Sequence, residues 1–527
     1  MGALSVPDVS VVVAVYNTMP YLTDCLSSVL RQTIGTDRLE LIAVDDGSTD
    51  GSGAELDRWA RRRPDVVTVI HQPNSGGPAA PSNRALDVAT GRYVFFLGAD
   101  DYLGHEALER LVRAADGLDA DIVLGRLVGV GGRYVNQAVF SDGNRDDITL
   151  ADSALPWALS NTKLFRRSLI EDLGLRYPEE LRSGSDQPFT MRAVVAARRI
   201  AVRADYKYYF AVRRGDAGNI TYRTSLSGFV HDTAVIMDTA ADVIADPVAR
   251  DRVLRRHFTW EVAKLLGDRF LAADRSEQAR VQEGVRKLAD TYLTEEIRAS
   301  LDVQRRIAIS VAQHGTLDDL VAVARHYAER GLKPIRSEGD RLYAGLPGFR
   351  DPASGFPDAW YDASDAIDEL IRQIGRADVR WARDAGGRRI LRVGWHIAMP
   401  VEDRPVEPTA TVAAGDRRGR LVVTPAAGGG ADLRAEFALD DLLAGETRRA
   451  HRPIRLTWTV GDTSHTAGVS RPDLAAAGRV VRRRGLRFYL VHLDGNPRSR
   501  LAVVINPLTP RNIAGRLARG LRTRGAR

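Results

Sequence analysis

Two neighbouring segments of the chain carry the residue types that bind phosphate and metal. Asn74, Ser75, Gly76 and Gly77 form a loop without bulky side chains, and a helix is expected to start near Pro81. Backbone N–H groups can approach a ligand closely in such a loop, and a helix N-terminus adds positive potential. The loop therefore predicts a diphosphate site, with a flexible crossover as the alternative.

A pair of aspartates follows that loop. Asp100 and Asp101 come after the apolar run YVFFL at 93–97. Adjacent carboxylates that face a diphosphate are best explained by a shared Mg²⁺ or Mn²⁺, because both cations prefer oxygen ligands. Such a cation would neutralise charge on a leaving nucleotide. We predict a metal site at these two residues.

Polar residues also end the two earlier apolar runs. Tyr16 and Asn17 close VVVAVYN, and Asp45 and Asp46 open the turn DDGSTDGSG. Ligands of open α/β sheets lie outside the carboxyl ends of the strands. A carboxylate there can accept a hydrogen bond from a uracil imide or from ribose hydroxyls. The alternatives are a helix cap with a surface tyrosine, and ordinary Asp-Gly turn chemistry.

A later aspartate is the candidate general base. Asp186 follows a Gly-Ser turn and starts the helical pattern DQPFTMRAVVAA. A carboxylate fixed there can take the proton from an incoming hydroxyl. The competing role is that of a helix N-cap, which aspartate also favours.

These residues need a sheet to bring them together. Apolar runs alternate with helical patterns over residues 1–225, which is the rhythm of a mainly parallel sheet with helical crossovers. One helix over 19–33 starts at Pro20 and buries one face. The expected strands are 9–16, 39–46, 66–71, 93–101 and 121–130, and the buried helical face consists of Leu22, Cys25, Leu26, Val29 and Leu30.

The rest of the chain divides into regions that differ in hydrophobic periodicity and composition. Residues 226–340 carry helical periodicity, and residues 341–387 form a Gly/Pro-rich junction with a helix expected around 364–375. Polar and apolar residues alternate over residues 388–507, with Gly/Asp turns between the runs. This pattern predicts a β-sandwich region made of one sandwich or two small ones. Residues 508–527 form a basic tail.

Composition limits the class of protein. The chain has 527 residues, a formal net charge of +7 and a single cysteine, Cys25, which excludes an internal disulfide or a cysteine metal cluster. No apolar run reaches the roughly 18 residues that span a bilayer, and the run at 9–15 lacks the flanks of a signal peptide. We expect a cytoplasmic protein.

Basic charge gathers near the C-terminus, in 479–487 and 510–527. Such segments favour anionic partners. A helix in the tail would place Ile513, Leu517 and Leu521 on one stripe and arginines elsewhere, which suits peripheral contact with the inner face of an anionic membrane. A disordered tail is the alternative, since Gly515 and Gly520 weaken the helix.

Taken in order, VVVAVYN, VDDGSTD, ATGRYVFFLGADD and SGSDQPF resemble the inverting family 2 glycosyltransferases of the GT-A fold, over residues 9 to about 222. NSGGPAAPSNRAL and YPEELRSGSDQPFTM look like the members that add N-acetylglucosamine to poly(ribitol phosphate) wall teichoic acid. Those members also have a helical linker and C-terminal β-sandwiches. The resemblance implies a Rossmann-like α/β catalytic domain, a UDP-sugar donor and a β-linked product from an α-linked donor.

The resemblance also implies site roles. Tyr16 and Asp46 would hold uracil, Asp100 and Asp101 the metal and ribose, and Asp186 would be the base. The nucleotide-sugar pocket would further include Asn17, Asn74, Gly76, Gly77, Pro78 and Arg84.

Three positions depart from the family pattern. Gly98 stands where relatives begin the metal motif with an aspartate, and Ser82 stands where many have an arginine, with Arg84 as a substitute. Relatives also have a histidine near the loop 213–221. Here that loop offers Asp216, Asn219 and Thr221, together with Arg213 and Arg214, which can bind phosphate or be solvated.

The expected function is transfer of N-acetylglucosamine or another hexose from a UDP-sugar to an anionic polyol-phosphate polymer. The alternatives are capsular, exopolysaccharide or lipid-linked oligosaccharide acceptors, and a non-catalytic polymer-binding protein with a degenerate transferase domain. The β region would serve homo-oligomerisation or polymer binding. Its aromatics Trp458 and Tyr489 are expected in the core, while Trp395 and Phe488 are further candidates for sugar stacking. No base-reading motif or zinc spacing predicts specific nucleic-acid binding.

Overall fold

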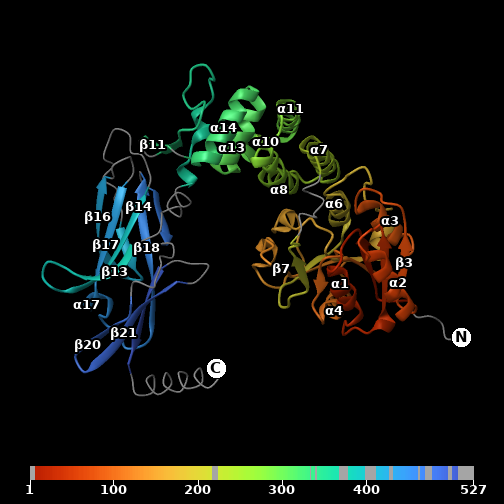
Figure 1. The fold of residues 1–527 in the computed structure, drawn as a ribbon, viewed down its shortest axis with the longest axis horizontal. Coiled ribbons are helices and arrows are strands. Elements are labelled where there is room, and N and C mark those ends of the chain that lie inside the picture. Colours follow the sequence, from red (N-terminus) through yellow and green to blue (C-terminus); the bar gives the residue numbers. More distant parts are fainter. Residues whose placement is uncertain are drawn as a thin grey trace. The chain divides into compact units, whose positions relative to one another are not determined.

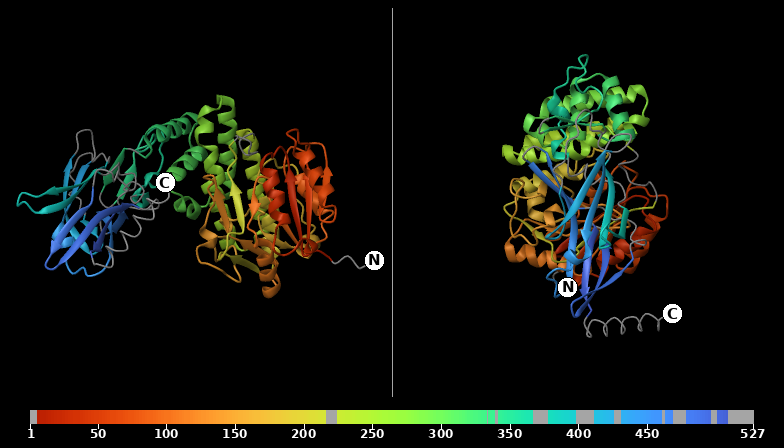
Figure 2. Two further views of the ribbon diagram at one scale, coloured as in Figure 1. Left: turned by 60° about the horizontal axis from the view of Figure 1, so that its bottom comes forward. Right: turned by 90° about the vertical axis from the view of Figure 1, so that its left-hand side faces the viewer.

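The computed structural model describes residues 6–215, 224–332, 334–338, 341–366, 378–397, 411–425, 431–460, 463–468, 478–495 and 501–508. Contacts divide the chain into two compact units, one of residues 1–301 and 308–317 and one of residues 302–307 and 318–527. Figures 1 and 2 show the elements of both units.

A seven-stranded sheet forms the centre of the N-terminal part. Its order is β3-β2-β1-β4-β8-β6-β9, and β8 alone runs antiparallel to its neighbours β4 and β6. This confirms the mainly parallel α/β sheet. The strands are β1 (Val9–Val15), β2 (Leu39–Asp45), β3 (Val67–His71), β4 (Tyr93–Phe96), β6 (Ile122–Gly125), β8 (Leu164–Arg166) and β9 (Ile200–Arg203).

Helices cover this sheet and share its core. α3 packs on β1 and β2, and α4 on β6. α1 buries Leu22, Cys25, Leu26 and Val29 as predicted, while Leu30 is only half-buried. The helices are α1 (Tyr21–Leu30), α2 (Ser52–Arg62), α3 (Ala79–Leu86), α4 (Ala107–Leu118), α5 (Arg167–Asp172) and α6 (Asp186–Ala196), with 3₁₀ turns η1 (Thr36–Arg38), η2 (Ala138–Phe140) and η3 (Leu155–Trp157).

Two expected strands differ from the structure. The strand expected at 93–101 ends at Phe96, because the chain turns and the Asp101 N–H bonds the Gly98 carbonyl at 3.0 Å. The run 121–130 is two strands in two sheets. The break needs Gly125, where a Cβ would lie 2.6 Å from the Cβ of Tyr208. The second sheet has the order β5-β10-β7, from β5 (Tyr102–Leu103), β7 (Leu127–Val130) and β10 (Tyr209–Val212).

The following segment is helical, as expected. Four of its helices begin at an N-cap side chain that accepts a backbone hydrogen bond, namely Ser225, Asp246, Asp274 and Thr294. The elements are α7 (Leu226–Val243), α8 (Pro247–His257), the π-helical turn η5 (Phe258–Val262), α9 (Ala263–Leu265), α10 (Asp268–Ala272), α11 (Arg275–Tyr292), α12 (Glu295–Ser300), α13 (Val303–His314) and α14 (Leu317–Arg330).

The described residues of the junction form short elements. An antiparallel pair, β11 (Ile335–Glu338) and β12 (Arg341–Ala344), precedes α15 (Asp358–Tyr361). Of the helix expected around 364–375, the structure describes a 3₁₀ turn, η6 (Ser364–Ala366), and residues 367–375 lie outside the described part.

The C-terminal region is all-β, as predicted, and its strands join one ten-stranded antiparallel sheet. β16 pairs with β15 through its first three residues and with β17 through its last six, so it changes partner within the sheet. The strands are β13 (Asp378–Arg383), β14 (Arg389–Ile397), β15 (Thr411–Ala414), β16 (Arg417–Pro425), β17 (Ala431–Ala438), β18 (Ala450–Val460), β19 (Thr463–Gly468), β20 (Val480–Arg484), β21 (Arg487–Gly495) and β22 (Leu501–Pro507), with a helical turn α17 (Leu439–Leu442).

Aromatic side chains of this region lie mostly inside. Trp395 and Tyr489 are each 4% exposed, whereas Phe488 is 47% exposed. The side chain of Trp458 and the tail residues 509–527 lie outside the described part. Among the residues described, no helix is both long and apolar enough to cross a bilayer.

Candidate active site

The loops after β1, β2 and β10 are fastened to one another. Asn17 has a φ of +51°, its amide oxygen accepts from the Thr49 N–H at 2.7 Å, and its own N–H donates to Ser48 Oγ at 3.1 Å. Arg214 donates to the Asn17 carbonyl at 2.9 Å. Tyr16 is half-buried beside Asn17. The structure thus brings the ends of β1 and β2 together and places the Arg214 cation against them.

Asp46 organises the glycine-containing loop. It is 2% exposed, and its carboxylate accepts hydrogen bonds from Gln72 Nε2 at 2.7 Å and from the Ser75 N–H at 3.0 Å. Ser75 Oγ and Asn74 Nδ2 donate to the same carboxylate at 3.0 and 3.3 Å. A carboxylate has about four lone-pair sites, so this loop uses most of its capacity. A hydrogen bond from uracil to Asp46 stays a prediction, and it requires that one of these donors moves away from the carboxylate.

Gly47 permits the close approach of that loop. Its φ is +76°, and a Cβ there would lie 2.8 Å from the Asn74 backbone nitrogen. Gly76 has a φ of +89° with no atom within 4 Å of a Cβ position, and Asn74 and Pro78 are exposed. The predicted pocket residues Asn74, Gly76, Gly77 and Pro78 therefore form one accessible turn. α3 begins directly after it, at Ala79.

One departure from the family pattern, Ser82, lies on α3 together with its suggested substitute Arg84. Ser82 is buried, and Arg84 is exposed with no hydrogen-bond or ion-pair partner in the part of the chain described here. Asn83 is buried between them and bonds the Tyr177 backbone, accepting from its N–H at 2.8 Å and donating to its carbonyl at 2.9 Å. This contact fixes α3 to the segment that leads to Asp186.

The two metal-site candidates differ in environment. Asp100 is half-buried, while Asp101 is 6% exposed and accepts hydrogen bonds from the Tyr209 hydroxyl and from the Val212 N–H at 2.7 Å. Burial and the charge of Asp100 raise the pKa of Asp101 to about 6, against the Tyr209 hydrogen bond. Tyr209 is a site residue that sequence reasoning missed, because YKYYFAV gave no sign that its hydroxyl reaches Asp101.

The carboxylates converge beside Gly98. A Cβ at this glycine would lie 2.8 Å from Asp101 Oδ2, 3.1 Å from the Tyr209 hydroxyl and 3.3 Å from Asp100 Oδ1. Asp100 has no partner among the described residues, and the described part contains no cluster of three or more metal-ligating side chains. Mg²⁺ is commonly held by one or two carboxylates together with substrate phosphates, so this pair fits such an ion. Asp216, Asn219 and Thr221 lie outside the described residues.

Asp186 is the first residue of α6, and Ser185 occupies the N-cap position. Burial raises the pKa of Asp186, while the charges of Lys163 and Arg256 and a backbone hydrogen bond from Asn161 oppose that rise. Aromatic packing sets the helix position, since Phe189 stacks on Tyr177 with centroids 4.4 Å apart. Asp186 is thus half-buried at the helix start, and the charges of Lys163 and Arg256 act on its carboxylate.

Lys163 is a buried cation that influences Asp186. It is 2% exposed, and its ammonium donates to the carbonyls of Ala158, at 2.6 Å, and Ser160. Burial lowers the pKa of Lys163 to about 7, against the charge of Asp186. Sequence reasoning missed this residue. A usable signal was its rarity, because only five of the 75 basic residues are lysines.

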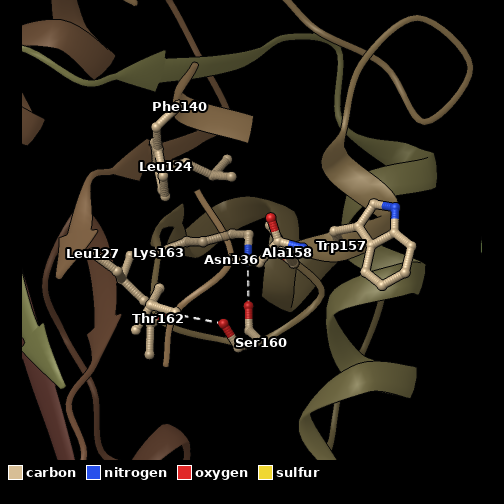
Figure 3. A pocket seen from close by; sticks show the side chains of 10 residues that line it. Leu124, Leu127, Asn136, Phe140, Trp157, Ala158, Ser160, Thr162 and Lys163 are labelled. Atoms are coloured by element: carbon tan, nitrogen blue, oxygen red, sulfur yellow. Dashed lines mark hydrogen bonds between the residues drawn. The ribbon is translucent and has the colours of Figure 1, made fainter. Parts of the chain in front are cut away.

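A small pocket of about 70 Å³ lies beside Lys163 (Figure 3). Its polar wall includes Ser160 and Thr162, whose hydroxyls are 2.8 Å apart. The lining residues are Leu124, Leu127, Val135, Asn136, Phe140, Trp157, Ala158, Ser160, Thr162 and Lys163.

The helical segment holds the loop that precedes Asp186. Ser183 donates its N–H and hydroxyl to Asp232 of α7, at 3.0 and 2.9 Å. Arg256 of α8 donates to Gln187 at 2.8 Å and pairs with Glu261 at 2.7 Å. The candidate base is therefore positioned from both the sheet and the helices.

Comparison with known proteins identifies the two N-terminal regions. Residues 10–174 match the glycosyl transferase family 2 model, and residues 227–324 match the glycosyl transferase TarS linker domain. The chain carries a family 2 glycosyl transferase domain. That domain contains every predicted donor and metal residue, from Tyr16 to Asp101.

Two similar proteins are named as poly(ribitol-phosphate) transferases. The chain is 39% identical over 215 residues to a poly(ribitol-phosphate) beta-glucosyltransferase of Bacillus spizizenii, covering 41% of this chain and 34% of the relative. It is 33% identical over 255 residues to the poly(ribitol-phosphate) beta-N-acetylglucosaminyltransferase TarS of Staphylococcus aureus, covering 48% of this chain and 44% of TarS. The matches thus span less than half of either relative.

Solved structures agree with the fold. The crystal structure of S. aureus TarS superimposes with a TM-score of 0.64 at 21% identity, covering 96% of this chain and 86% of that one. TarS 1–349 in complex with UDP-GlcNAc gives a TM-score of 0.57 at 28% identity, covering 66% of this chain and 98% of that fragment.

Proposed function

We propose that this protein is an inverting, metal-dependent glycosyltransferase that moves a hexose from a UDP-sugar to a hydroxyl of a polyol-phosphate cell-envelope polymer. The observation that carries the proposal is the family 2 match over 10–174, which includes the donor loop and both metal candidates. The named relatives use ribitol phosphate polymers as acceptors, which favours that polymer class here.

The donor would lie across the loop ends of β1 and β2. The backbone N–H groups of the turn 74–78 and the N-terminus of α3 would bind the diphosphate. The uridine would contact Tyr16, Asn17 and Asp46. Arg84, which is exposed on α3, would contact the donor from the solvent side. Asp100 and Asp101 would hold Mg²⁺ or Mn²⁺, which when bound would supply positive charge to the diphosphate.

Asp186 would act as general base. Its carboxylate takes the proton of the acceptor hydroxyl, and the hydroxyl oxygen forms a bond to the anomeric carbon as the bond from that carbon to UDP breaks. Attack from the face opposite the leaving UDP inverts the centre, so an α-linked donor gives a β-linked product. Lys163 would keep Asp186 in the charged form that accepts the proton.

The proposal also assigns the regions of the chain. Residues 1–225 would form the catalytic domain, 226–340 a linker module, 341–387 a junction, and 388–507 an accessory region for homo-oligomerisation or polymer binding. A UDP-sugar donor is consistent with action in the cytoplasm, and the basic tail at 508–527 would contact the membrane peripherally.

A donor and acceptor screen tests this function. UDP release would be measured with UDP-glucose and UDP-N-acetylglucosamine, each with poly(ribitol phosphate) or poly(glycerol phosphate), with and without Mn²⁺. We expect polymer-dependent UDP release with one of these donors and its loss on metal chelation. If no donor is consumed with either polymer, the non-catalytic polymer-binding protein becomes the better explanation.

A further inference from the structure

The hairpin β20–β21 ends the C-terminal sheet, and β20 is its edge strand (Figure 1). The segment 478–493 contains five arginines and no acidic residue. In the described structure only Arg482 pairs with a carboxylate, that of Asp440 at 2.8 Å. The exposed arginines are Arg479, Arg482, Arg483, Arg484 and Arg487.

The same hairpin exposes large apolar side chains. Leu486, in the turn after Gly485, is 93% exposed, Val481 is 57% exposed and Phe488 is 47% exposed. Val481 and Phe488 lie on one face, because Val481 pairs with Leu490 and Arg483 with Phe488. The opposite face buries Tyr489 and Val491 in the core. The guanidinium carbon of Arg483 lies 5.9 Å from the centroid of the Phe488 ring. The tip therefore combines positive charge with exposed apolar side chains.

Edge protection explains only part of this pattern. Charged side chains on an edge strand prevent pairing with other sheets, and the arginines of β20 suit that role. It does not explain the apolar residues, since an exposed leucine and phenylalanine beside a free edge promote the association that the charges oppose. A ligand with both negative charge and an apolar interior satisfies both features at once.

We propose that the β20–β21 hairpin docks on an anionic lipid membrane, with Leu486 and Phe488 entering the interface and the arginines contacting lipid phosphates. Cationic and apolar side chains together are typical of segments that bind membrane surfaces. A soluble polyphosphate chain complements the arginines equally well but offers no apolar phase for the leucine. The inference is independent of the transferase reaction.

A site-specific probe tests the contact in the full chain. The native cysteine, Cys25, is fully buried, so Leu486→Cys can be labelled selectively with an environment-sensitive fluorophore. Leu173→Cys, at a leucine 45% exposed in the other unit, is the matched control. We expect a blue shift at position 486 with phosphatidylglycerol vesicles, weaker at high salt, and none with phosphatidylcholine vesicles or at position 173.

Three results would overturn the proposal. The first is an unchanged probe at 486 with phosphatidylglycerol, even if the protein binds the vesicles through another segment. The second is an equal shift with inorganic polyphosphate alone, which would indicate a polymer partner. The third is a shift that follows protein concentration without lipid, which would indicate a second copy of the chain.

Vesicle co-sedimentation gives a second readout. The pair Leu486→Asp with Phe488→Asp should weaken phosphatidylglycerol binding about tenfold, because both apolar contacts and local positive charge are lost. Leu173→Asp should leave binding unchanged, and a thermal melt checks that each variant is folded. Equal binding of the double variant and the wild type would contradict the hairpin contact.

Discussion

Lys163 is the residue on which the proton affinity of Asp186 depends most directly. Lys163 is 2% exposed, and its ammonium donates to two backbone carbonyls. Burial raises the pKa of Asp186, and the charge of Lys163 is the largest effect that lowers it. A charge in such surroundings is weakly screened. Removing the charge of Lys163 should therefore change the pH range in which Asp186 is ionised and can accept a proton.

Lys163→Met keeps most of the side-chain volume and removes the charge. Without the cation the pKa of Asp186 rises further, so the acidic limb of the profile of kcat/KM against pH should move to higher pH. The profile of wild type and variant would be measured with saturating acceptor. Lys287→Met, which removes an exposed lysine of α11 in the same unit, is the control. Superimposable profiles for wild type and Lys163→Met would contradict the coupling.

Gly98 is the second residue with a direct structural test. Because a Cβ there would crowd Asp101 and Tyr209, Gly98→Ala should lower the free energy of unfolding by about 1–3 kcal/mol and weaken Mn²⁺ binding. Gly117→Ala is the matched control, since Gly117 lies in α4 with no atom within 4 Å of a Cβ. It should be neutral or stabilise by up to about 1 kcal/mol. Equal melting temperatures for the two variants would refute the crowding.

The side-chain types of the site were readable from the sequence, but their partners were not. Asp46, Asp100 and Asp186 stood out because carboxylates at strand ends and helix starts are chemically useful. The hydrogen bonds from Ser75 to Asp46 and from Tyr209 to Asp101 join residues 29 and 108 positions apart, which no local pattern reports. Lys163 was missed for the same reason.

At the scale of elements, the loop after β2 and the loop before α3 form one unit. Gly47 and Gly51 both have positive φ, but only at Gly47 would a Cβ meet the Asn74 backbone. Gly47→Ala should therefore weaken UDP binding about tenfold, equivalent to about 1.4 kcal/mol, whereas Gly51→Ala should change it little. Calorimetric titration with UDP compares the two. Equal losses would mean that backbone strain, rather than the Asn74 contact, is responsible.

The long elements were predicted well, and the short ones were not. β1 and β2 are seven residues each and mostly buried and apolar, so their type and position followed from the sequence. β8 has three residues and β10 has four, which is too short for a period to be visible. These two strands are also the ones that place β4 against β6 and Tyr209 against Asp101.

At the scale of the molecule, α13 is divided between the two units, since residues 303–307 belong to one and residues 308–314 to the other. Arg298, 5% exposed, donates to Ser310 Oγ and to Gln313 Oε1 at 2.8 Å, so α12 depends on α13. A fragment of residues 1–332 should keep UDP binding. A fragment of residues 1–301 should unfold at lower temperature, since each lost charged hydrogen bond costs about 1.5–3 kcal/mol. Identical melting curves for the fragments would show that α13 is dispensable.

The proposed reaction requires Asp186 to remove the acceptor proton at a UDP-sugar site. The most direct measurement is the rate of UDP release in the presence of poly(ribitol phosphate) for Asp186→Asn and for Asp172→Asn, an exposed aspartate of α5. Asp186→Asn should lose about 10²–10⁴ in kcat with unchanged affinity for the UDP-sugar, and Asp172→Asn should match the wild type. Wild-type turnover by Asp186→Asn would contradict the account.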